Sequence, residues 1–496
     1  MRDSPHSEDP QPNPPALIPP ARSSDRPRQA KPARTFPVGW RLSTMVLLLV
    51  LVGGGILVYA RGSAVPLPRL YTSPDVLIKI GADLPLMGMD EITGQAAENG
   101  MRLAINEANA AHFLPGYRFV PDPYNDIPPS GEHGGFALGA ENVAAMIGDA
   151  QVAGIIGPLN SSVALSEMAI ANQAPIVMIS PANSHTCLTQ NTPASGCTGN
   201  EDYLPVLRPS GKVTYFRVAP VDSWQGVFAA EFASSSQSYH TAYVLDDTML
   251  YGMLLTRHFT QEFRKYGGHI LGYDSLRPLT DYTQELTKIA ALHPDMIYFG
   301  GLDSTGGIAL YKQMASIPGL THTPSLGGDG ILTDAFARAV GTPHGPVYST
   351  LGTVDVTRIP SMAGFVNTYQ AAYGPLSIST NYPYGGLYSA YSYDSAKILL
   401  NAIKTAVTTG FQVPTTGGAA KAATIFRQAV IDAVAKTDYD GVLGHQSFDA
   451  NGDTTNNSIS LYQFTNVNGS PAWQYLTTQA VPVPPGWKYD LMTTRL

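Results

Sequence analysis

The stretch that most constrains the fold is residues 153–186, where two short apolar runs alternate with polar loops and one apolar-striped segment. Residues 153–156 and 176–179 predict buried strands, and residues 163–172 predict a helix between them. A strand, a helix and a strand in this order form a parallel βαβ unit, whose polar loops lie at the carboxyl ends of adjacent strands. Because open α/β sheets bind ligands at this edge, we expect the two loops to hold the head group of a small polar ligand.

The same alternation of strands and helices begins at residue 76 and continues to about residue 353. It predicts an α/β fold with parallel sheets and right-handed crossovers. From residue 441 the pattern changes to short alternating strands, which end at residues 459–464 and are followed by a polar tail. At 496 residues the chain is long enough for two or three domains.

The first 75 residues differ from the rest. Residues 1–41 are rich in Pro and polar residues, which predicts a disordered tail, and residues 61–75 read as a Pro-containing linker. Residues 42–60 carry no charge, and nineteen residues at a rise of 1.5 Å span about 28 Å, close to the thickness of a bilayer core. Arg and Lys residues precede this segment, so we expect a single-pass cell-membrane anchor with the tail in the cytoplasm and the bulk of the chain extracytoplasmic. The alternative is a signal peptide cleaved near Val58-Tyr59-Ala60.

Charge and cysteine content narrow the classes of partner. The net charge of -8 argues against nucleic acid or an anionic membrane surface as the main partner, because both are bound through clustered Lys and Arg. The two cysteines, Cys187 and Cys197, lie ten positions apart in a loop-like segment. In an exported protein this pair predicts a local disulfide worth roughly 2–3 kcal/mol. A zinc site that uses His185 and Cys187 is the alternative, although no second ligand pair at metal spacing follows.

Two segments approach the motifs of catalysis or metal binding without matching them. Residues 301–306 contain Ser304, but not in the GxSxG spacing that a nucleophilic serine needs. Residues 448–453 begin like a calcium loop, yet Thr454 stands where the loop needs Gly and Ser460 where it needs Glu. We therefore expect a turn at the second segment, and a chain that is not an enzyme and carries no cofactor or metal.

Small polar residues at predicted strand ends form the candidate site. Ser161 lies just before a helix, where its hydroxyl and backbone N–H can bind a carboxylate at the positive end of the helix dipole. Ala182 and Ser184 follow the next strand and can offer a carbonyl and a hydroxyl to an ammonium group. Asp329, between two glycines at another strand end, is the best candidate for neutralising that ammonium.

A series of motifs in this order along residues 76–465 adds a family resemblance. The motifs are GADLPLMGMD, IIGPLNSS, VMISPANS, YFRVAPVDSWQG, VLDDTMLYG, DYT and IYFGG. Together they resemble the periplasmic leucine/isoleucine/valine-binding proteins of ABC transporters, the type I branched-chain amino-acid-binding family. The resemblance implies a two-lobed clamp, with residues 76–217 and 353–449 in lobe 1 and residues 218–352 and 450–496 in lobe 2.

The resemblance also implies roles for individual residues. The carboxylate-binding serine falls on Ser161, the alanine carbonyl and the neighbouring hydroxyl on Ala182 and Ser184, and the acidic residue that meets the ammonium on Asp329. Tyr251 matches the aromatic residue that closes over the ligand from the second lobe. Where the family has aromatic walls, this chain has Thr93 and either Leu302 or Asp303.

What the resemblance implies for function is a solute-binding protein of an ABC transporter. Its partners would be a branched-chain or related amino acid, or an amide, held between the lobes, and an ABC permease. Two alternatives stay open. One is a membrane-anchored ligand sensor that signals through a partner protein, and the other is an enzyme built on the same scaffold.

Overall fold

The computed structural model describes residues 75–129, 136–192, 195, 197, 199–277, 281–355, 358–374, 388–415 and 420–480. The predicted tail and membrane anchor, and all of the predicted linker except Asp75, lie outside these residues. Among the helices inside the described ranges, none is both long and apolar enough to cross a membrane.

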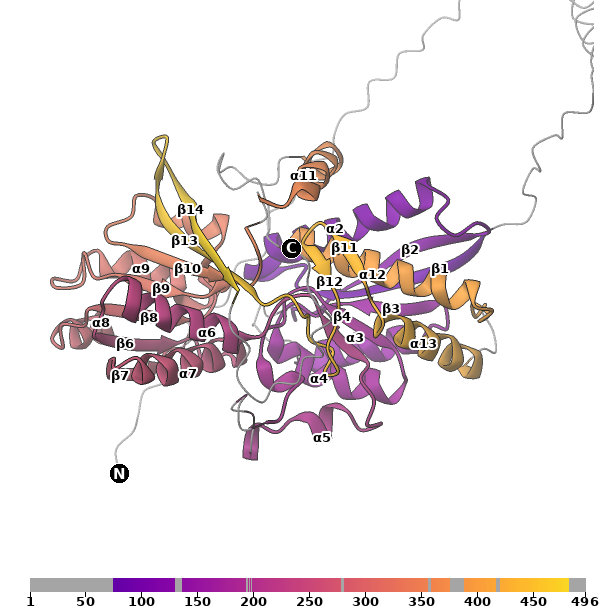
Figure 1. Ribbon diagram of the computed structural model, residues 1–496, viewed down its shortest axis with the longest axis horizontal. Helices are drawn as coiled ribbons and strands as arrows, with labels where there is room; N and C mark the ends of the chain where they lie inside the picture. Colours follow the sequence, from indigo (N-terminus) through magenta and orange to yellow (C-terminus); the bar gives the residue numbers. More distant parts are fainter. Residues whose placement is uncertain are drawn as a thin grey trace, which may run out of the picture. The chain divides into compact units, whose positions relative to one another are not determined.

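Lobe 1 is built on a five-stranded parallel sheet in the order β2-β1-β3-β4-β5 (Figure 1). Its strands are β1 (Val76–Leu84), β2 (Tyr117–Asn125), β3 (Val152–Ile156), β4 (Val177–Ser180) and β5 (Tyr215–Arg217). Every residue of β3 and β4 is buried, because helices cover both faces of the sheet and leave these strands no solvent side. This explains why their sequences are continuous apolar runs.

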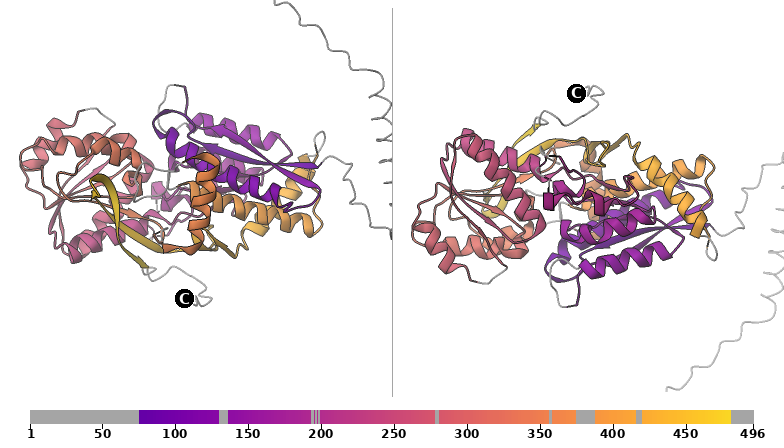
Figure 2. Two further views of the ribbon diagram at one scale, coloured as in Figure 1. Left: turned by 90° about the horizontal axis from the view of Figure 1, so that it is seen from above. Right: turned by 90° about the horizontal axis from the view of Figure 1, so that it is seen from below.

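The helices of lobe 1 divide between the two faces of this sheet (Figure 2). Ile80 and Ile156 pack in one core with α2 (Glu91–Ala110) and α12 (Tyr388–Thr408), whereas Ile155 and Met178 pack in another with α3 (Phe136–Gly148) and α4 (Ser161–Gln173). The other α-helices and strands that the structure describes in this lobe are α5 (Leu204–Leu207), α11 (Pro360–Tyr373), α13 (Ala420–Val434) and the strand pair β11 (Tyr439–Gly441) and β12 (Gly444–Gln446). Lobe 1 therefore combines two segments that are distant in sequence.

Lobe 2 is built on a seven-stranded sheet in the order β14-β13-β10-β9-β8-β6-β7. Its strands are β6 (Thr241–Asp246), β7 (His269–Ser275), β8 (Met296–Gly300), β9 (Ser325–Gly327), β10 (Val347–Leu351), β13 (Ser458–Val467) and β14 (Ser470–Ala480). The strands from β6 to β10 pair in parallel, and β13 and β14 add an antiparallel edge. The prediction of a polar tail after residue 464 is wrong, because Asn468 and Gly469 adopt positive φ and turn the chain back into β14.

Within the described residues, five α-helices cover the second sheet. On one face, α6 (Asp222–Glu231) and α7 (Leu250–Lys265) bury Trp224, Phe228 and Phe259 against β6, β8 and β9. The other face carries α8 (Thr283–Ala290), α9 (Ile308–Met314) and α10 (Asp334–Val340). The loops that follow the carboxyl ends of β6, β8 and β9 contribute residues to the site.

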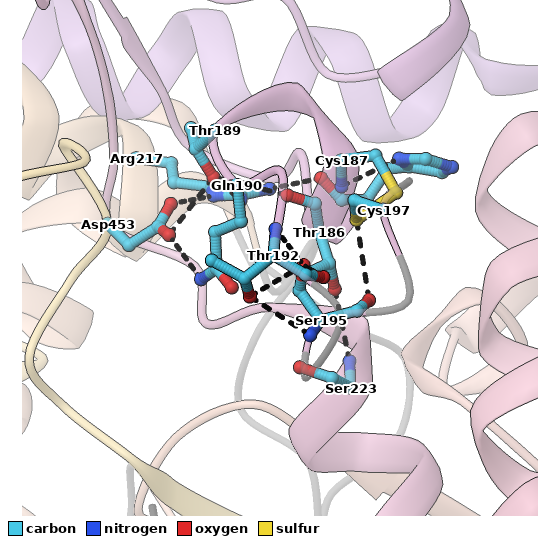
Figure 3. Close-up of a disulfide and its surroundings, with 11 residues drawn as sticks. Thr186, Cys187, Thr189, Gln190, Thr192, Ser195, Cys197, Arg217, Ser223 and Asp453 are labelled. Atoms are coloured by element: carbon cyan, nitrogen blue, oxygen red, sulfur yellow. Dashed lines mark hydrogen bonds and ion pairs between the residues drawn. A yellow bond between two sulfur atoms is a disulfide. The ribbon is translucent and has the colours of Figure 1, made fainter. Parts of the chain in front are cut away.

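The chain passes between the lobes three times, after β5, after β10 and before β13. A buried ion pair joins two of these crossings: Arg217, the last residue of β5, binds Asp453 with Nε and Oδ1 2.7 Å apart (Figure 3). The Arg217 side chain is 0% exposed and that of Asp453 is 2% exposed. Asp453 belongs to residues 448–453, the segment predicted to be a turn rather than a calcium loop. The backbone N–H of Asp453 donates to the Asp449 carboxylate at 2.9 Å.

The cysteine segment packs against the same ion pair. Cys187 and Cys197 form a disulfide, as predicted, and Thr189 and Gln190 within its loop donate to the second carboxylate oxygen of Asp453 at 3.0 Å and 2.8 Å (Figure 3). The zinc alternative is wrong, because the Cys187 sulfur is used in the disulfide and His185 Nδ1 accepts the Cys187 backbone N–H at 3.2 Å. The disulfide loop therefore supports the crossing segments directly.

Removing the disulfide should lower stability by about 2–3 kcal/mol, because the cross-link limits the entropy of the unfolded chain. The Cys187→Ala/Cys197→Ala double variant tests this in urea unfolding followed by tryptophan fluorescence. Wild-type protein unfolded with a reductant should match the double variant, and the reductant should not change the double variant. If the reductant does not change the urea midpoint of wild-type unfolding, the prediction is wrong.

Candidate functional site

Two loops of lobe 1 form one wall of the candidate site, at the carboxyl ends of β3 and β4. Ser180, the last residue of β4, donates through its hydroxyl to the Pro158 carbonyl at 2.7 Å and accepts the Asn183 backbone N–H at 2.9 Å. Ser161 is the first residue of α4, and its hydroxyl lies 3.4 Å from the His185 backbone N–H. These bonds hold the two loops side by side, with Ser161 at the positive end of a thirteen-residue helix.

Asp329 faces the site from lobe 2 in the short helical turn η7 (Asp329–Ile331), which follows β9. Tyr251 donates its hydroxyl to Asp329 Oδ1 at 2.8 Å, and Gln225 donates Nε2 to the same oxygen at 3.3 Å. The glycines beside Asp329 permit this approach, because a Cβ at Gly328 would stand 2.3 Å from the Tyr251 hydroxyl. Burial raises the pKa of the Asp329 carboxyl, and the hydrogen bonds from Tyr251 and Gln225 oppose that rise.

A second buried acid, Asp222, lies at the start of α6 and was not among the predicted site residues. Its backbone N–H donates to the Ser184 carbonyl at 2.8 Å, which connects the two lobes. Burial raises the pKa of Asp222 to about 8; the Ser184 hydroxyl lowers that pKa and the negative charge of Asp329 raises it. The only sequence signal was its place in the segment VAPVDSWQG after β5.

One cavity collects residues from both lobes, and all seven predicted ligand-binding residues line it: Thr93, Ser161, Ala182, Ser184, Tyr251, Leu302 and Asp329. Eleven other residues complete the lining: Pro85, Asp90, Leu159, Asn160, Ser162, Met249, Leu250, Asp303, Gly330, Thr333 and Tyr388. Of these, sequence reasoning had offered only Asp303 as an individual site residue, as an alternative to Leu302, and had placed Asn160 and Ser162 in one of the two loops expected to hold the head group. The cavity measures about 70 Å³, on a scale on which one water needs roughly 10–15 Å³, so it can take a small organic molecule.

Acidic residues dominate the charge of the lining. Asp90, Asp303 and Asp329 all contribute, whereas no Lys, Arg or His occurs among the lining residues that the structure describes. The positive potential for an anionic group therefore comes from the amino end of α4, and the rest of the cavity favours positive charge. Chemically, the arrangement fits a ligand that presents a carboxylate to lobe 1 and an ammonium group to Asp329.

Comparisons with known proteins identify the family of this chain. A family model described as "Periplasmic binding protein" matches residues 77–470. The Leu/Ile/Val-binding protein BraC3 of Rhizobium johnstonii is 24% identical over 395 residues, which are 78% of this chain and 91% of that protein.

Solved structures show the same fold at lower identity. The leucine-binding protein LivK from Thermotoga maritima matches with a TM-score of 0.63 and 21% identity, over 81% of this chain and 98% of that chain. A solute-binding protein of an ABC transporter from Rhodopseudomonas palustris was solved with 3,4-dihydroxybenzoic acid. It matches with a TM-score of 0.63 and 18% identity, over 83% of this chain and 99% of that chain. The chain therefore belongs to the periplasmic binding protein family and has the two-lobed type I fold of its leucine/isoleucine/valine-binding relatives.

Proposed function

We propose that this chain is the extracytoplasmic solute-binding protein of an ABC transporter and that it binds an amino acid between its two lobes. The observation that carries the proposal is that Ser161 and Asp329 line one cavity from opposite lobes. An α-amino acid has a carboxylate and an ammonium group on one carbon, and so it can engage both lobes at once. The relatives named above, which bind leucine, isoleucine or valine by their names, support the same class of ligand.

The proposed mechanism is closure of the lobes on the ligand. The ligand carboxylate would bind at the start of α4 beside Ser161, and its ammonium group would bind Asp329, with the Ala182 carbonyl and the Ser184 hydroxyl beside it. Because these groups belong to different lobes, the ligand binds the closed arrangement better than the open one and shifts the population toward it. The closed form would then be recognised by a permease. We also propose that residues 42–60, which lie outside the described residues, anchor the protein in the cell membrane with its lobes outside the cytoplasm.

A ligand panel tests the proposal on the full-length chain, purified in mild detergent. We expect at least one α-amino acid to raise the melting temperature by several degrees, because a ligand at a hundred times its Kd stabilises the folded state by about 2.7 kcal/mol. The panel should contain the natural amino acids, their amides and small carboxylic acids, with 3,4-dihydroxybenzoic acid as a ligand that has no amine. If no amino acid changes the melting temperature, the proposal is refuted. If only the carboxylic acids raise it, the ligand belongs to a different class.

A further inference from the structure

A hydrogen bond joins the two lobes directly at the cavity wall. Asp90 ends the helical turn η1 (Gly88–Asp90) of lobe 1, and Ser304 lies in the helical turn η6 (Asp303–Gly307) of lobe 2. The Ser304 hydroxyl donates to Asp90 Oδ1 at 2.8 Å, although the two residues are 214 positions apart in sequence. Because Asp90 lines the cavity and its donor belongs to the other lobe, this bond forms only when the lobes approach each other.

The lobe 2 side of this contact is held in place by Asp247, which directly follows β6 and is 0% exposed. Its carboxylate accepts the backbone N–H of Met249 at 3.0 Å and that of Leu302 at 3.1 Å, and it also accepts the Thr305 hydroxyl. Ser304 lies between Leu302 and Thr305 in sequence. The position of Ser304 is therefore set by the fold of lobe 2, before any contact with lobe 1 is made.

The lobe 1 side of the contact uses a side chain that has a second place to bind. Asp90 is the N-cap residue of α2, where an Asp usually accepts a backbone N–H of its own helix. Within the described residues of α2 it makes no such capping bond. When the lobes separate, the Asp90 carboxylate can cap α2 instead, and its charge stays favourable at the positive end of this twenty-residue helix. The bond between the lobes can therefore form and break readily.

We propose that Ser304 and Asp90 form a latch, which holds the two lobes together at the cavity and so favours the closed clamp over the open one. Neither residue adjoins a crossing between the lobes, so the latch adds a connection that the three crossings do not provide. A hydrogen bond to a charged group is strong enough to change the ratio of closed to open molecules by about tenfold. The latch does not depend on the proposed function, because it acts whichever molecule the cavity binds.

Spin labels on the two lobes test the latch in the full-length chain in detergent, with no ligand added. Ala110→Cys on α2 and Lys312→Cys on α9 place labels at exposed positions of lobe 1 and lobe 2, and the two native cysteines are protected by their disulfide. Double electron–electron resonance then gives the distances between the labels. We expect Ser304→Ala to lower the ratio of short to long distances about tenfold, and Ser304→Thr, which keeps a hydroxyl, to retain the wild-type ratio.

Asp90→Asn tests the acceptor side and should also lower the share of short distances. Burial raises the pKa of Asp126, and the charges of Asp83 and Asp90 add to that rise, so this variant changes more than the latch. A double-mutant cycle isolates the bond: Ser304→Ala should have a smaller effect in the Asp90→Asn background than in wild type.

Two results would overturn the latch. One is an identical distance distribution for wild type and Ser304→Ala, and the other is an effect of Ser304→Ala that Asp90→Asn does not diminish. Should Ser304→Ala not fold, an unchanged distribution in Asp90→Asn would overturn the latch as well. Because ligand binding is not measured, each of these results leaves the proposed function standing, and the ligand panel can fail without affecting the latch.

Discussion

The Asp329→Asn variant should lose most of its affinity for amino acids while its fold stays intact. The substitution keeps the shape of the side chain but removes the charge that faces the ligand ammonium group. Truncating one partner of a buried, hydrogen-bonded charge pair typically costs about 2–5 kcal/mol, which corresponds to a loss of roughly thirtyfold or more. Stability should not fall, since burial already raises the pKa of this carboxyl and a neutral amide carries no such cost.

Calorimetry and thermal melting check both halves of this prediction. The amino acid that binds best should be compared with its deaminated analogue, which keeps the carboxylate and the side chain but lacks the ammonium group. The variant should bind the deaminated analogue as well as wild type does. Asp432→Asn, a control at an exposed acid on α13 outside the cavity lining, should behave as wild type with both ligands. Equal losses for the amino acid and its analogue would show that Asp329 does not meet the ammonium group.

Removing one partner of the Arg217–Asp453 pair should destabilise the protein more than any other single change considered for this chain. Arg217→Met leaves a carboxylate that is 2% exposed without its cation, and such a loss typically costs about 3–5 kcal/mol. Ligand affinity should fall as well, because Arg217 also donates to the carbonyl of His185 at 2.8 Å, next to Ser184 in the ligand loop. Urea unfolding of each variant, followed by ligand titration, measures the two effects.

A double-mutant cycle separates the ion pair from the packing around it. Asp453→Leu should be about as destabilising as Arg217→Met, and the double variant Arg217→Met/Asp453→Leu should recover much of the loss, because apolar residues can replace a buried pair at little cost. If the single variants unfold at the same urea concentration as wild type, the assignment of a coupled buried pair is wrong. It is also wrong if the stability losses of the two single variants add up in the double variant.

The parts of the fold that follow from local pattern were predictable. Residues 153–156 were read as a buried strand and 163–172 as a helix, and the structure gives β3 (Val152–Ile156) and α4 (Ser161–Gln173). Strands of this kind can be predicted from continuous apolar runs, because both faces of the sheet are covered. The strand β14 was missed because it lies at the sheet edge and six of its eleven residues are exposed, although the dipeptide Asn468-Gly469 signals a hairpin.

The residues of the candidate site were also predictable only in part. Ser161, Ala182, Ser184 and Asp329 could be named because each follows a recognisable strand, and the structure brings them to one cavity; their roles in binding stay predictions. Contacts between distant segments could not be read from the chain. Gln225 donates to Asp329 across 104 positions and Arg217 pairs with Asp453 across 236, and no local periodicity records such pairings.

The three crossings between the lobes also bear on how the chain is made. Once residues 76–351 have left the ribosome, all strands of the first sheet exist, but α12, which covers one face of it, has not been synthesised. In the second sheet β10 then has an open edge, because its neighbour β13 begins only at Ser458. Exposed apolar faces and unpaired strand edges favour aggregation, and pairings this distant in sequence form slowly. Neither lobe can therefore fold to completion while only residues 76–351 have been made, and the nascent chain depends on protection from aggregation until the later helices and strands that complete each sheet are available.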